Sequence, residues 1–457
     1  MPRTERLSHL SPTGGMSRGR ITELRLTAFK SYTDATLPLE PLTLLIGRNG
    51  SGKSNGLDAL EVISRLARDD EVRDALEGNR RDAEPVRGGL DGCAPHGSDS
   101  FAIGVTLETE VSKKVMLDVT VRVRPQVQVI AEKLCVHVGG AKWRTLLESQ
   151  EPGLHGADLD ASVWNGGKGR NPIRTFRSSH LLSAQLPLRI AGTTAGEREL
   201  LEVVDAALAV LGGVFHLDPV PHLMRQYVAE QDVVLRRTAE NLSAAVARLK
   251  LDDRDKFNQL VEVVKTLPEY EVRTLDIGRG GFGEVMLAVK ERRGRTSVTV
   301  PARQMSDGML RMLAIATALI TGGGGLAIDT GPAARGAALM LVIEELENGL
   351  HPSQAAQLLR LIKSASSNQG FQVLLTTPSP ALLNALSGDD HPGVVVIERE
   401  RTSGRSTATR PVDLPGYLRL MAGSRLGDAV AGGRLVEAAE APPRLSESDL
   451  DRMLGIA

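Results

Sequence analysis

A short stretch near the N-terminus combines residue types and a spacing that suit phosphate binding. Residues Leu44–Asn55 read as an apolar strand, a glycine-rich loop and a helix start, and they fit G-x-x-x-x-G-K-[ST], the P-loop pattern. Glycines let successive backbone N–H groups turn inward around an anion, and the following helix adds its positive N-terminal end. We expect Lys53 to neutralise the β- and γ-phosphates and the Ser54 hydroxyl to ligate Mg²⁺. The alternative is a Gly/Ser linker, which the agreement of strand, loop, Lys-Ser and helix disfavours. The predicted nucleotide-binding residues are Gly47, Asn49, Gly50, Ser51, Gly52, Lys53, Ser54 and Asn55.

An apolar run that ends in two acids predicts the second half of a nucleotide site. Leu339–Ile343 is continuously apolar, as in a strand buried on both faces, and Glu344 and Glu345 follow it directly. We expect Glu344 to hold Mg²⁺ through its water shell and Glu345 to orient and polarise an attacking water. The alternative is an ordinary buried strand that emerges into a charged loop. The P-loop upstream favours the functional interpretation.

Three residues, Ser306, Asp307 and Gly308, precede an apolar helix that is predicted to run from Met309 to Ile320. Ser306 is well placed to cap that helix, which is the structural interpretation. In the functional interpretation, Ser306, Asp307 and Gly308 form a second anion site with the helix end. That site would serve a nucleotide held by another copy of the chain.

A second glycine-rich loop imitates a different class of enzyme. Gly278–Val285 fits the protein-kinase pattern G-x-G-x-x-G-x-V, and Lys290 stands where the kinase strand lysine would follow. No H-R-D-x-x-x-x-N or D-F-G stretch follows, although that chemistry needs them for its base and its Mg²⁺ ligands. We therefore interpret this loop as a glycine-rich turn between two strands.

Composition excludes several broad classes of function. The chain has 457 residues, 41% of them hydrophobic, so one large domain with insertions or two to three domains are feasible. A net charge of −1 gives no global basic field, so any nucleic-acid surface must be local. Cys93 and Cys135 provide neither a disulfide framework nor a metal site, which suits a reducing cytoplasm. No stretch reads as a membrane span, so we expect no membrane partner.

The hydrophobic pattern divides the chain into alternating strand-rich and helical parts. We expect a hairpin over 21–39, a helix from the P-loop to about Ala75 with loop from Asp69 to Ser100, and an antiparallel meander over 101–139. Residues 148–179 read as loop-rich, 197–211 and 222–267 as helices, 272–300 as strands, and 321–338 as flexible. Phe371–Leu375 and Gly393–Ile397 are further buried strands. The predicted units are a tail at 1–18, an N-terminal lobe at 19–145, a loop-rich and helical lid at 146–270, a C-terminal lobe at 271–410 and a helical extension at 411–457.

Four stretches together resemble a known family. Asn55 follows the P-loop, M-S-D-G-x-L-R begins at Met305, I-E-E-L-E-N-G-L-H-P begins at Ile343, and T-T-P-S-P-x-L-L begins at Thr376. The combination resembles the ABC-type ATPases of the SMC/RecF group, and within it the AAA_21-type predicted ATPases typified by the OLD-family nucleases. The resemblance implies an α/β fold, an ABC-type P-loop head with a mixed central sheet, an antiparallel β lobe and an inserted helical subdomain.

The resemblance also implies a paired arrangement of two heads around two ATP molecules with Mg²⁺. Ser306 and Gly308 would then contact the γ-phosphate bound at Lys53 of the partner. Glu345 would be the general base, and Glu347–His351 would occupy the loop that crosses the dimer interface. Gln185 would sense Mg²⁺ and water, with an ordinary loop glutamine as the equal alternative.

The sequence departs from the family pattern at two positions. Leu346 replaces the usual proline after the acid pair, a small change in packing. Pro378 replaces a histidine that touches the γ-phosphate in the family, and proline has no side-chain donor. Hydrolysis is then slow, or Thr377 or Ser379 makes the contact.

Three hypotheses about function follow from the motifs and the resemblance. The first is an ATP-driven dimerising switch, a homodimer or higher oligomer, that acts on DNA or with a nuclease or effector in DNA repair or phage defence. The second is a regulatory nucleotide sensor with little hydrolysis. The third is a transporter ATPase subunit, disfavoured because the trio at Ser306 lies about 250 residues beyond the P-loop. Basic residues in the helical block either meet phosphates or form solvated helix faces; they are Arg225, Arg236, Arg237, Arg248 and Lys250.

Overall fold

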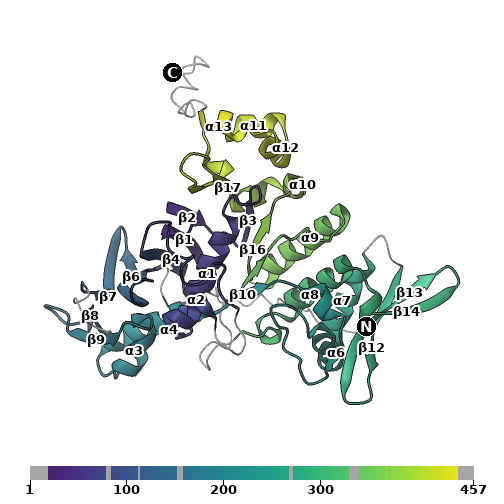
Figure 1. Cartoon of the computed structure of the whole chain (residues 1–457), viewed down its shortest axis with the longest axis horizontal. Helices are drawn as coiled ribbons and strands as arrows, with labels where there is room; N and C mark the ends of the chain where they lie inside the picture. The colour runs from purple at the N-terminus through teal and green to yellow at the C-terminus, as the bar shows by residue number, and fades with distance from the viewer. Residues whose placement is uncertain are drawn as a thin grey trace, which may run out of the picture.

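The structure is a computed structural model that describes residues 19–78, 84–111, 114–151, 158–266, 271–328, 339–369 and 371–440. The predicted tail at 1–18 and most of the stretch predicted to be flexible, 329–338, lie outside the described residues. Two lobes flank a central sheet, with β6–β9 and α3 on one side and α6–α8 with β12–β14 on the other (Figure 1). The last helices form a projection beyond the central sheet (Figure 1).

One large mixed sheet dominates the described part of the chain. It contains 14 strands among the described residues, in the order β10-β15-β16-β3-β17-β18-β2-β1-β4-β5-β6-β7-β8-β9. Five neighbouring strands pair in parallel, which explains their continuous apolar runs, because both faces are covered. The three predicted buried strands lie here and the α/β class is confirmed. The parallel strands are β3 (Leu42–Ile46), β10 (Val214–Leu217), β15 (Met340–Ile343), β16 (Gln372–Thr377) and β17 (Val394–Arg399).

The remainder of the sheet is mainly antiparallel and begins with the predicted hairpin and meander. Both predictions are confirmed, since the first five of these strands pair as an antiparallel set. The short strand β18 pairs antiparallel with β17 and bridges it to β2 through Ser406 and Tyr32. The strands are β1 (Arg20–Phe29), β2 (Tyr32–Pro38), β4 (Ser100–Glu108), β5 (Val115–Arg122), β6 (Gln128–Gly139), β7 (Lys142–Ser149), β8 (Asp158–Val163), β9 (Ile173–Arg177) and β18 (Ser406–Thr409).

The loop-rich prediction for 148–179 was wrong where β8 and β9 continue the meander, although the residues between these strands are irregular. In β8, Leu159, Ala161 and Val163 are buried on one face while polar residues alternate with them. The polar face of these short strands hid the alternation in the sequence.

The helices of the N-terminal lobe cover the sheet and carry the P-loop. The predicted helix to about Ala75 is two helices, because the chain turns through left-handed backbone at Asp69 (φ 68°). A capping box between Thr194 and Glu197 begins α4, as the helical prediction for 197–211 requires. The helices are α1 (Lys53–Ala67), α2 (Val72–Glu77), α3 (Leu182–Arg189) and α4 (Ala195–Gly212).

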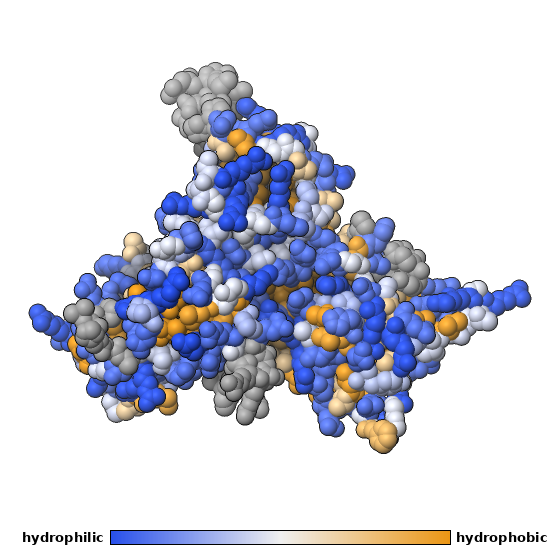
Figure 2. Space-filling model, in the orientation of Figure 1, coloured by the Kyte–Doolittle hydropathy of each residue, from blue (hydrophilic) through white to orange (hydrophobic). Residues whose placement is uncertain are grey.

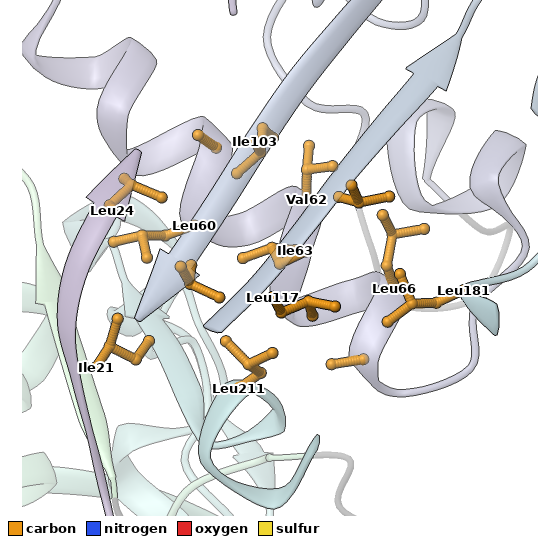
Figure 3. Close-up of a cluster of buried hydrophobic side chains, with 14 of the residues drawn as sticks. Ile21, Leu24, Leu60, Val62, Ile63, Leu66, Ile103, Leu117, Leu181 and Leu211 are labelled. Carbon is orange, nitrogen blue, oxygen red and sulfur yellow. The ribbon is translucent and has the colours of Figure 1, made fainter. Parts of the chain in front are cut away.

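Helix α1 is held in place by a hydrophobic core between the sheet and α4. Leu60, Ile63 and Leu66 of α1 project among sheet residues that include Ile21 and Ile103 (Figure 3). All five side chains are essentially inaccessible to solvent. Burial of each such side chain contributes about 1.5–3 kcal/mol, so the helix that begins at Lys53 has a fixed axis.

The second lobe combines helices with a small sheet of its own. The prediction of helix over 222–267 holds for the end of α5 and for α6 and α7, and it fails for the irregular segment between α5 and α6. The predicted strands over 272–300 are confirmed and form a four-stranded sheet with β11. Helix α8 is buried among neighbouring helices in a second hydrophobic core. The elements are α5 (Pro221–Met224), β11 (Val228–Ala229), α6 (Leu242–Asp252), α7 (Arg254–Lys265), β12 (Val272–Arg279), β13 (Glu284–Arg293), β14 (Thr296–Pro301), α8 (Asp307–Thr321) and α9 (Pro352–Gln369), with 3₁₀ turns η1 (Ala302–Gln304) and η2 (Gly323–Gly325).

The C-terminal extension is helical, as predicted. The face of the molecule shown in Figure 2 is mostly hydrophilic, and hydrophobic residues form scattered areas on it. None of the described helices is long and apolar enough to cross a membrane. Helix α10 (Pro380–Leu383) and the turn η4 (Gly388–Gly393) precede β17. The described part of the extension comprises η5 (Pro411–Asp413), α11 (Tyr417–Gly423), α12 (Leu426–Ala431) and α13 (Leu435–Glu440).

Candidate nucleotide site

A cavity lies at the carboxyl ends of the parallel strands, where α/β sheets usually bind ligands. Its volume is about 230 Å³. It brings together six of the eight predicted P-loop residues and both acids that follow β15. The lining residues are Asn49, Gly50, Gly52, Lys53, Ser54, Asn55, Glu344, Glu345, Thr376 and Arg399.

The two remaining predicted P-loop residues, Gly47 and Ser51, do not line the cavity. Gly47 lies against β17 so closely that an added Cβ would approach the Ile397 carbonyl oxygen to 2.2 Å. Ser51 is buried, and its hydroxyl has no hydrogen-bond partner among the described residues. An unsatisfied buried hydroxyl in a loop of this kind is a feature that a bound phosphate would explain.

The loop is held in shape by hydrogen bonds from strands on its far side. The Ser406 hydroxyl donates to the Ser51 carbonyl oxygen at 2.6 Å, and the Tyr32 hydroxyl donates to the Gly52 carbonyl oxygen at 3.0 Å. Asn55 donates to the Ser31 hydroxyl at 2.7 Å. Gly52 has left-handed backbone (φ 111°), and a Cβ there would meet the Ser406 hydroxyl at 2.3 Å, so only glycine fits.

Lys53 spans the loop from the first turn of α1. Its ammonium donates to the carbonyl oxygens of Gly47 at 2.6 Å and of Arg48 at 3.1 Å. Burial lowers the pKa of Lys53, and the neighbouring carboxylates of Glu345, Glu347 and Glu344 oppose that shift. The ammonium is thus held over the loop, where a β- or γ-phosphate would lie.

Ser54 and Glu344 present the oxygen donors that Mg²⁺ prefers. The Ser54 hydroxyl donates to the Glu344 carboxylate, and Arg87 donates to the same carboxylate at 2.8 Å. Burial opposes ionisation of Glu344, but the hydrogen bonds from Arg87 and Ser54 outweigh it and lower its pKa. An ionised carboxylate beside a hydroxyl fits one Mg²⁺.

The fit implies that most ligands of such an ion come from outside the protein. The described residues contain no group of three or more His, Cys, Asp or Glu side chains that could hold a metal. Phosphate oxygens and water would complete the shell, as is common for Mg²⁺ in ATPases.

Arg87 is a site residue that sequence reasoning missed. It follows α2 in the stretch read as loop, and it bridges Glu344 to Asp58 of α1, 3.1 Å from its Nε. Lys30 pairs with the other Asp58 oxygen at 2.6 Å. Nothing in the local sequence marks Arg87, because its partners are distant in the chain.

Glu345 lies at the end of β15 with an unusual backbone conformation. Its φ is 49°, a left-handed value that is uncommon outside glycine. The Thr376 hydroxyl accepts the Glu345 N–H at 2.9 Å, and the Thr376 carbonyl accepts the Leu346 N–H at 3.2 Å. Backbone of this kind concentrates at functional sites, which is compatible with the predicted role of Glu345 as general base.

The Thr377–Ser379 turn does not line the cavity. The Thr377 hydroxyl donates to Glu347 at 2.8 Å and accepts the Ser379 N–H at 2.9 Å. The hydroxyl hydrogen is therefore engaged by Glu347. The expectation that Thr377 replaces the missing histidine gains no support from this geometry.

The predicted trio at Ser306 lies away from the cavity of its own chain. Ser306 caps α8 by accepting the Met309 N–H at 3.2 Å, and Asp307 pairs with Arg225 at 2.5 Å. A Cβ on Gly308 would approach the Gly349 carbonyl oxygen to 2.6 Å. The trio thus packs against the Glu347–His351 segment, and its role toward a partner's nucleotide stays a prediction.

Gln185 is not brought to the cavity, so the structure does not support its predicted role as a Mg²⁺ sensor. It is on α3, and its amide oxygen accepts the Arg177 N–H at 3.0 Å. Its amide nitrogen donates to the carbonyl oxygens of Arg177 and Leu181 at 2.9 and 3.3 Å. The side chain is buried and fastens α3 to β9.

The basic residues of the helical block are engaged in ion pairs within the chain. Arg237 reaches Glu61 of α1 at 2.6 Å, and Lys250 pairs with Asp276 at 3.1 Å. Arg236 and Arg248 pair with acids of the block, and Arg225 pairs with Asp307 of α8. This pattern favours the structural interpretation of these cations.

Beneath the P-loop helix, Glu61 joins a nearly buried polar cluster. The His216 imidazole lies 3.8 Å from Glu61, and its Nε2 has no hydrogen-bond partner among the described residues. Burial lowers the pKa of His216 to about 4. Burial opposes ionisation of Glu61, but His216, Arg237 and Arg65 lower its pKa to about 2.

The kinase-like loop is a hairpin turn between β12 and β13, as interpreted from the sequence. The Gly280 N–H donates to the Glu284 carbonyl at 2.8 Å, and Lys290 pairs with Asp276 at 2.8 Å. It lies in the second sheet and contributes no residue to the cavity.

Two family models match this chain. Residues 20–144 match the model described as "AAA ATPase domain" and residues 218–384 match "AAA domain, putative AbiEii toxin, Type IV TA system", named AAA_21. The two segments carry the P-loop and the acid pair that meet in the cavity. Both segments therefore belong to ATPase domains. The match over residues 218–384 is to the AAA_21 type of domain that the motifs indicated.

The solved structures that this ATPase is similar to are remote in sequence. The SMC head domain from Thermotoga maritima is 14% identical, with 86% of this chain and 98% of that chain covered and a TM-score of 0.39. The Smc head domain with an extended coiled coil, bound to the C-terminal domain of ScpA and derived from Pyrococcus furiosus, is 13% identical, with coverage of 86% and 96% and a TM-score of 0.45. The recombination mediator RecF with ATP is 11% identical, with coverage of 87% and 100% and a TM-score of 0.37. No curated protein sequence matches this chain.

Proposed function

We propose that this ATPase is an ATP-driven switch whose heads pair around two Mg²⁺–ATP molecules. The supporting observation is the convergence of Lys53, Ser54, Glu344 and Glu345 on one cavity from distant parts of the chain. Lys53 would bind the β- and γ-phosphates, and Ser54 and Glu344 would hold Mg²⁺, which supplies charge neutralisation when bound. Glu345 would orient the attacking water and accept its proton.

The position of the trio at Ser306 supports the proposed pairing of two heads. Ser306 and Gly308 are at the start of α8, outside the cavity that contains Lys53 of the same chain. A second copy is needed to bring that helix start to a bound γ-phosphate, whose charge would favour the positive helix end. Binding would then join the heads, and hydrolysis would release them.

The test of pairing is the mass of the particle in solution. The Glu345→Gln variant should be a dimer with Mg²⁺–ATP and a monomer with ADP, measured by light scattering after gel filtration. Adding Ser306→Arg to that variant should prevent the dimer without weakening ATP binding, because Ser306 is outside the cavity of its own chain. A dimer that forms with either nucleotide and persists in the Ser306→Arg variant would contradict the pairing proposal.

The process served by the switch is proposed as DNA repair or phage defence, with a nuclease or effector as partner. The resemblance to the SMC/RecF group supports the first, and a matched model whose description names a toxin supports the second. The two free cysteines, both buried, accord with a reducing cytoplasm.

A second candidate function is a nucleotide sensor that binds ATP and hydrolyses it slowly. The observation that favours it is Pro378, together with a Thr377 hydroxyl that is engaged by Glu347 and Ser379. Single-turnover kinetics separates the two, since a sensor retains bound ATP long after the switch has released ADP.

A further inference from the structure

Arg399 lines the nucleotide cavity from an unexpected side. It is the last residue of β17, beyond the P-loop motif and beyond the acid pair. Of the ten lining residues, Lys53 and Arg399 are the two cations. Arg48, although it belongs to the loop itself, does not line the cavity.

The order of the strands tells which part of a nucleotide Arg399 would meet. The sheet runs β15, β16, β3, β17, so Arg399 and the acids of β15 lie on opposite sides of the P-loop strand. Neighbouring strands are about 4.8 Å apart, which places the two walls roughly 14 Å apart. Because Glu344 and Glu345 mark the γ-phosphate end, the nucleoside end must extend toward β17.

The position of Arg399 is fixed by close packing below it. The Ile397 carbonyl, two residues earlier on β17, lies where a Cβ on Gly47 would be 2.2 Å away. Arg399 Nε donates to the Gly404 carbonyl oxygen at 2.9 Å, across the hairpin to β18. Among the described residues no partner is recorded for its two terminal nitrogens, which are the pair that binds phosphate in a forked geometry.

We propose that Arg399 binds the α-phosphate of the nucleotide, at the end of the cavity opposite the acid pair. The inference rests on the proposed function, because it assumes that the cavity takes a nucleoside di- or triphosphate. Lys53 serves the β- and γ-phosphates, so the α-phosphate otherwise has only backbone N–H groups and no cation beside it. A contact at this end is made equally to ATP and to ADP.

The test compares nucleotide affinities, which report the contact without turnover. Arg399→Ala should weaken the affinities for ADP and for GDP equally, by about tenfold, because an exposed charged hydrogen bond contributes toward the low end of its usual range. The affinity for ATP, measured in the Glu345→Gln background, should fall by the same factor. Arg399→Lys should restore part of the affinity, and Arg401→Ala is the matched control, an exposed arginine of the same hairpin outside the cavity. Thermal unfolding of each variant checks that the hairpin remains intact.

Several outcomes overturn the inference. Unchanged ADP affinity in Arg399→Ala, or a loss for ATP alone, would place no contact at the α-phosphate. A loss for ADP without a loss for GDP would mean that Arg399 meets the base instead. If the wild type binds no nucleotide, the proposed function fails and this inference with it; if the wild type binds and Arg399→Ala binds equally, only this inference fails.

Discussion

Two glycine-rich loops of this chain are alike in composition and differ in their surroundings. The loop at Gly47–Gly52 joins a parallel strand to a helix and lines a cavity. The loop at Gly278–Gly283 joins two antiparallel strands, and the Phe282 side chain at its tip is 95% exposed. Glycine spacing alone therefore does not distinguish a phosphate site from a hairpin turn.

The difference comes from what each topology places beside the loop. A parallel strand has neighbours whose carboxyl ends meet at the same edge, which brings Glu344, Glu345 and Thr376 to Lys53. The hairpin brings only its own second strand, so Lys290 meets an acid of the adjacent strand, Asp276. The following predictions test this contrast from the largest expected effect to the smallest.

The two lysines provide the largest contrast. Lys53→Ala should lower ATP affinity by about 100-fold, because a charged hydrogen bond to phosphate contributes about 1.5–3 kcal/mol. Lys290→Ala should leave ATP affinity nearly unchanged, because that lysine is outside the cavity. Equilibrium binding of ATP measures both, and a large loss from Lys290→Ala would revive the kinase interpretation.

Two glycines provide a matched comparison of backbone strain. Gly50 and Gly283 both have φ of 78°, and nothing lies within 4 Å of a Cβ at either position. Substitution by alanine at either position should lower the free energy of unfolding by a similar amount, about 1–2 kcal/mol. Only Gly50→Ala should also weaken ATP binding, by about tenfold, because the strained loop presents the phosphate-binding N–H groups. Equal ATP binding by both variants would show that the conformation of Gly50 does not matter to the site.

Pro378 offers a smaller effect in the favourable direction. Pro378→His should raise steady-state ATP turnover by about fivefold, because a new hydrogen bond to the γ-phosphate contributes about 1 kcal/mol in the transition state. Pro378→Ala is the control, since it relieves the proline without adding a donor. Turnover that stays at the wild-type rate would mean that this position does not limit hydrolysis.

The titratable groups beneath the two loops predict different responses to pH. Burial lowers the pKa of His216 to about 4 from 6.5, so the unfolded chain takes up a proton below pH 6.5 while the folded chain does not. The free energy of unfolding should thus fall by about 2 kcal/mol between pH 7.5 and pH 5.

The matched variants separate the buried cluster from the exposed pair. Urea unfolding at each pH measures the free energy of unfolding. His216→Gln should flatten the decline in this free energy between pH 7.5 and pH 5. Asp276→Asn should leave it unchanged, because the pKa of Asp276, held low chiefly by Lys290, is about 2 and lies below the range. A decline that persists in His216→Gln would exclude His216 as its source.

The sequence predicts the parts of the site that depend on local pattern. The P-loop and the acid pair are contiguous motifs, and their apolar strands mark them as buried. The break between α1 and α2 and strands β8 and β9 escaped prediction, because a single left-handed Asp69 and short strands with a polar face leave little periodicity. Arg87 and Arg399 escaped too, since their partners are distant in the chain. Gln185, for which a Mg²⁺ sensor and an ordinary loop glutamine were equal alternatives, has a buried side chain that joins α3 to β9 rather than one that lines the cavity.

Steady-state ATP turnover of the wild type beside Glu345→Gln, with and without double-stranded DNA, tests the central claim most directly. The variant keeps the size of the side chain but removes the carboxylate that would activate water. We expect wild-type turnover that rises with DNA and is absent from the variant. Turnover that is present but indifferent to DNA would point to a protein partner as the trigger. Wild-type turnover equal to that of Glu345→Gln under every condition would contradict the claim that this chain works by hydrolysing ATP.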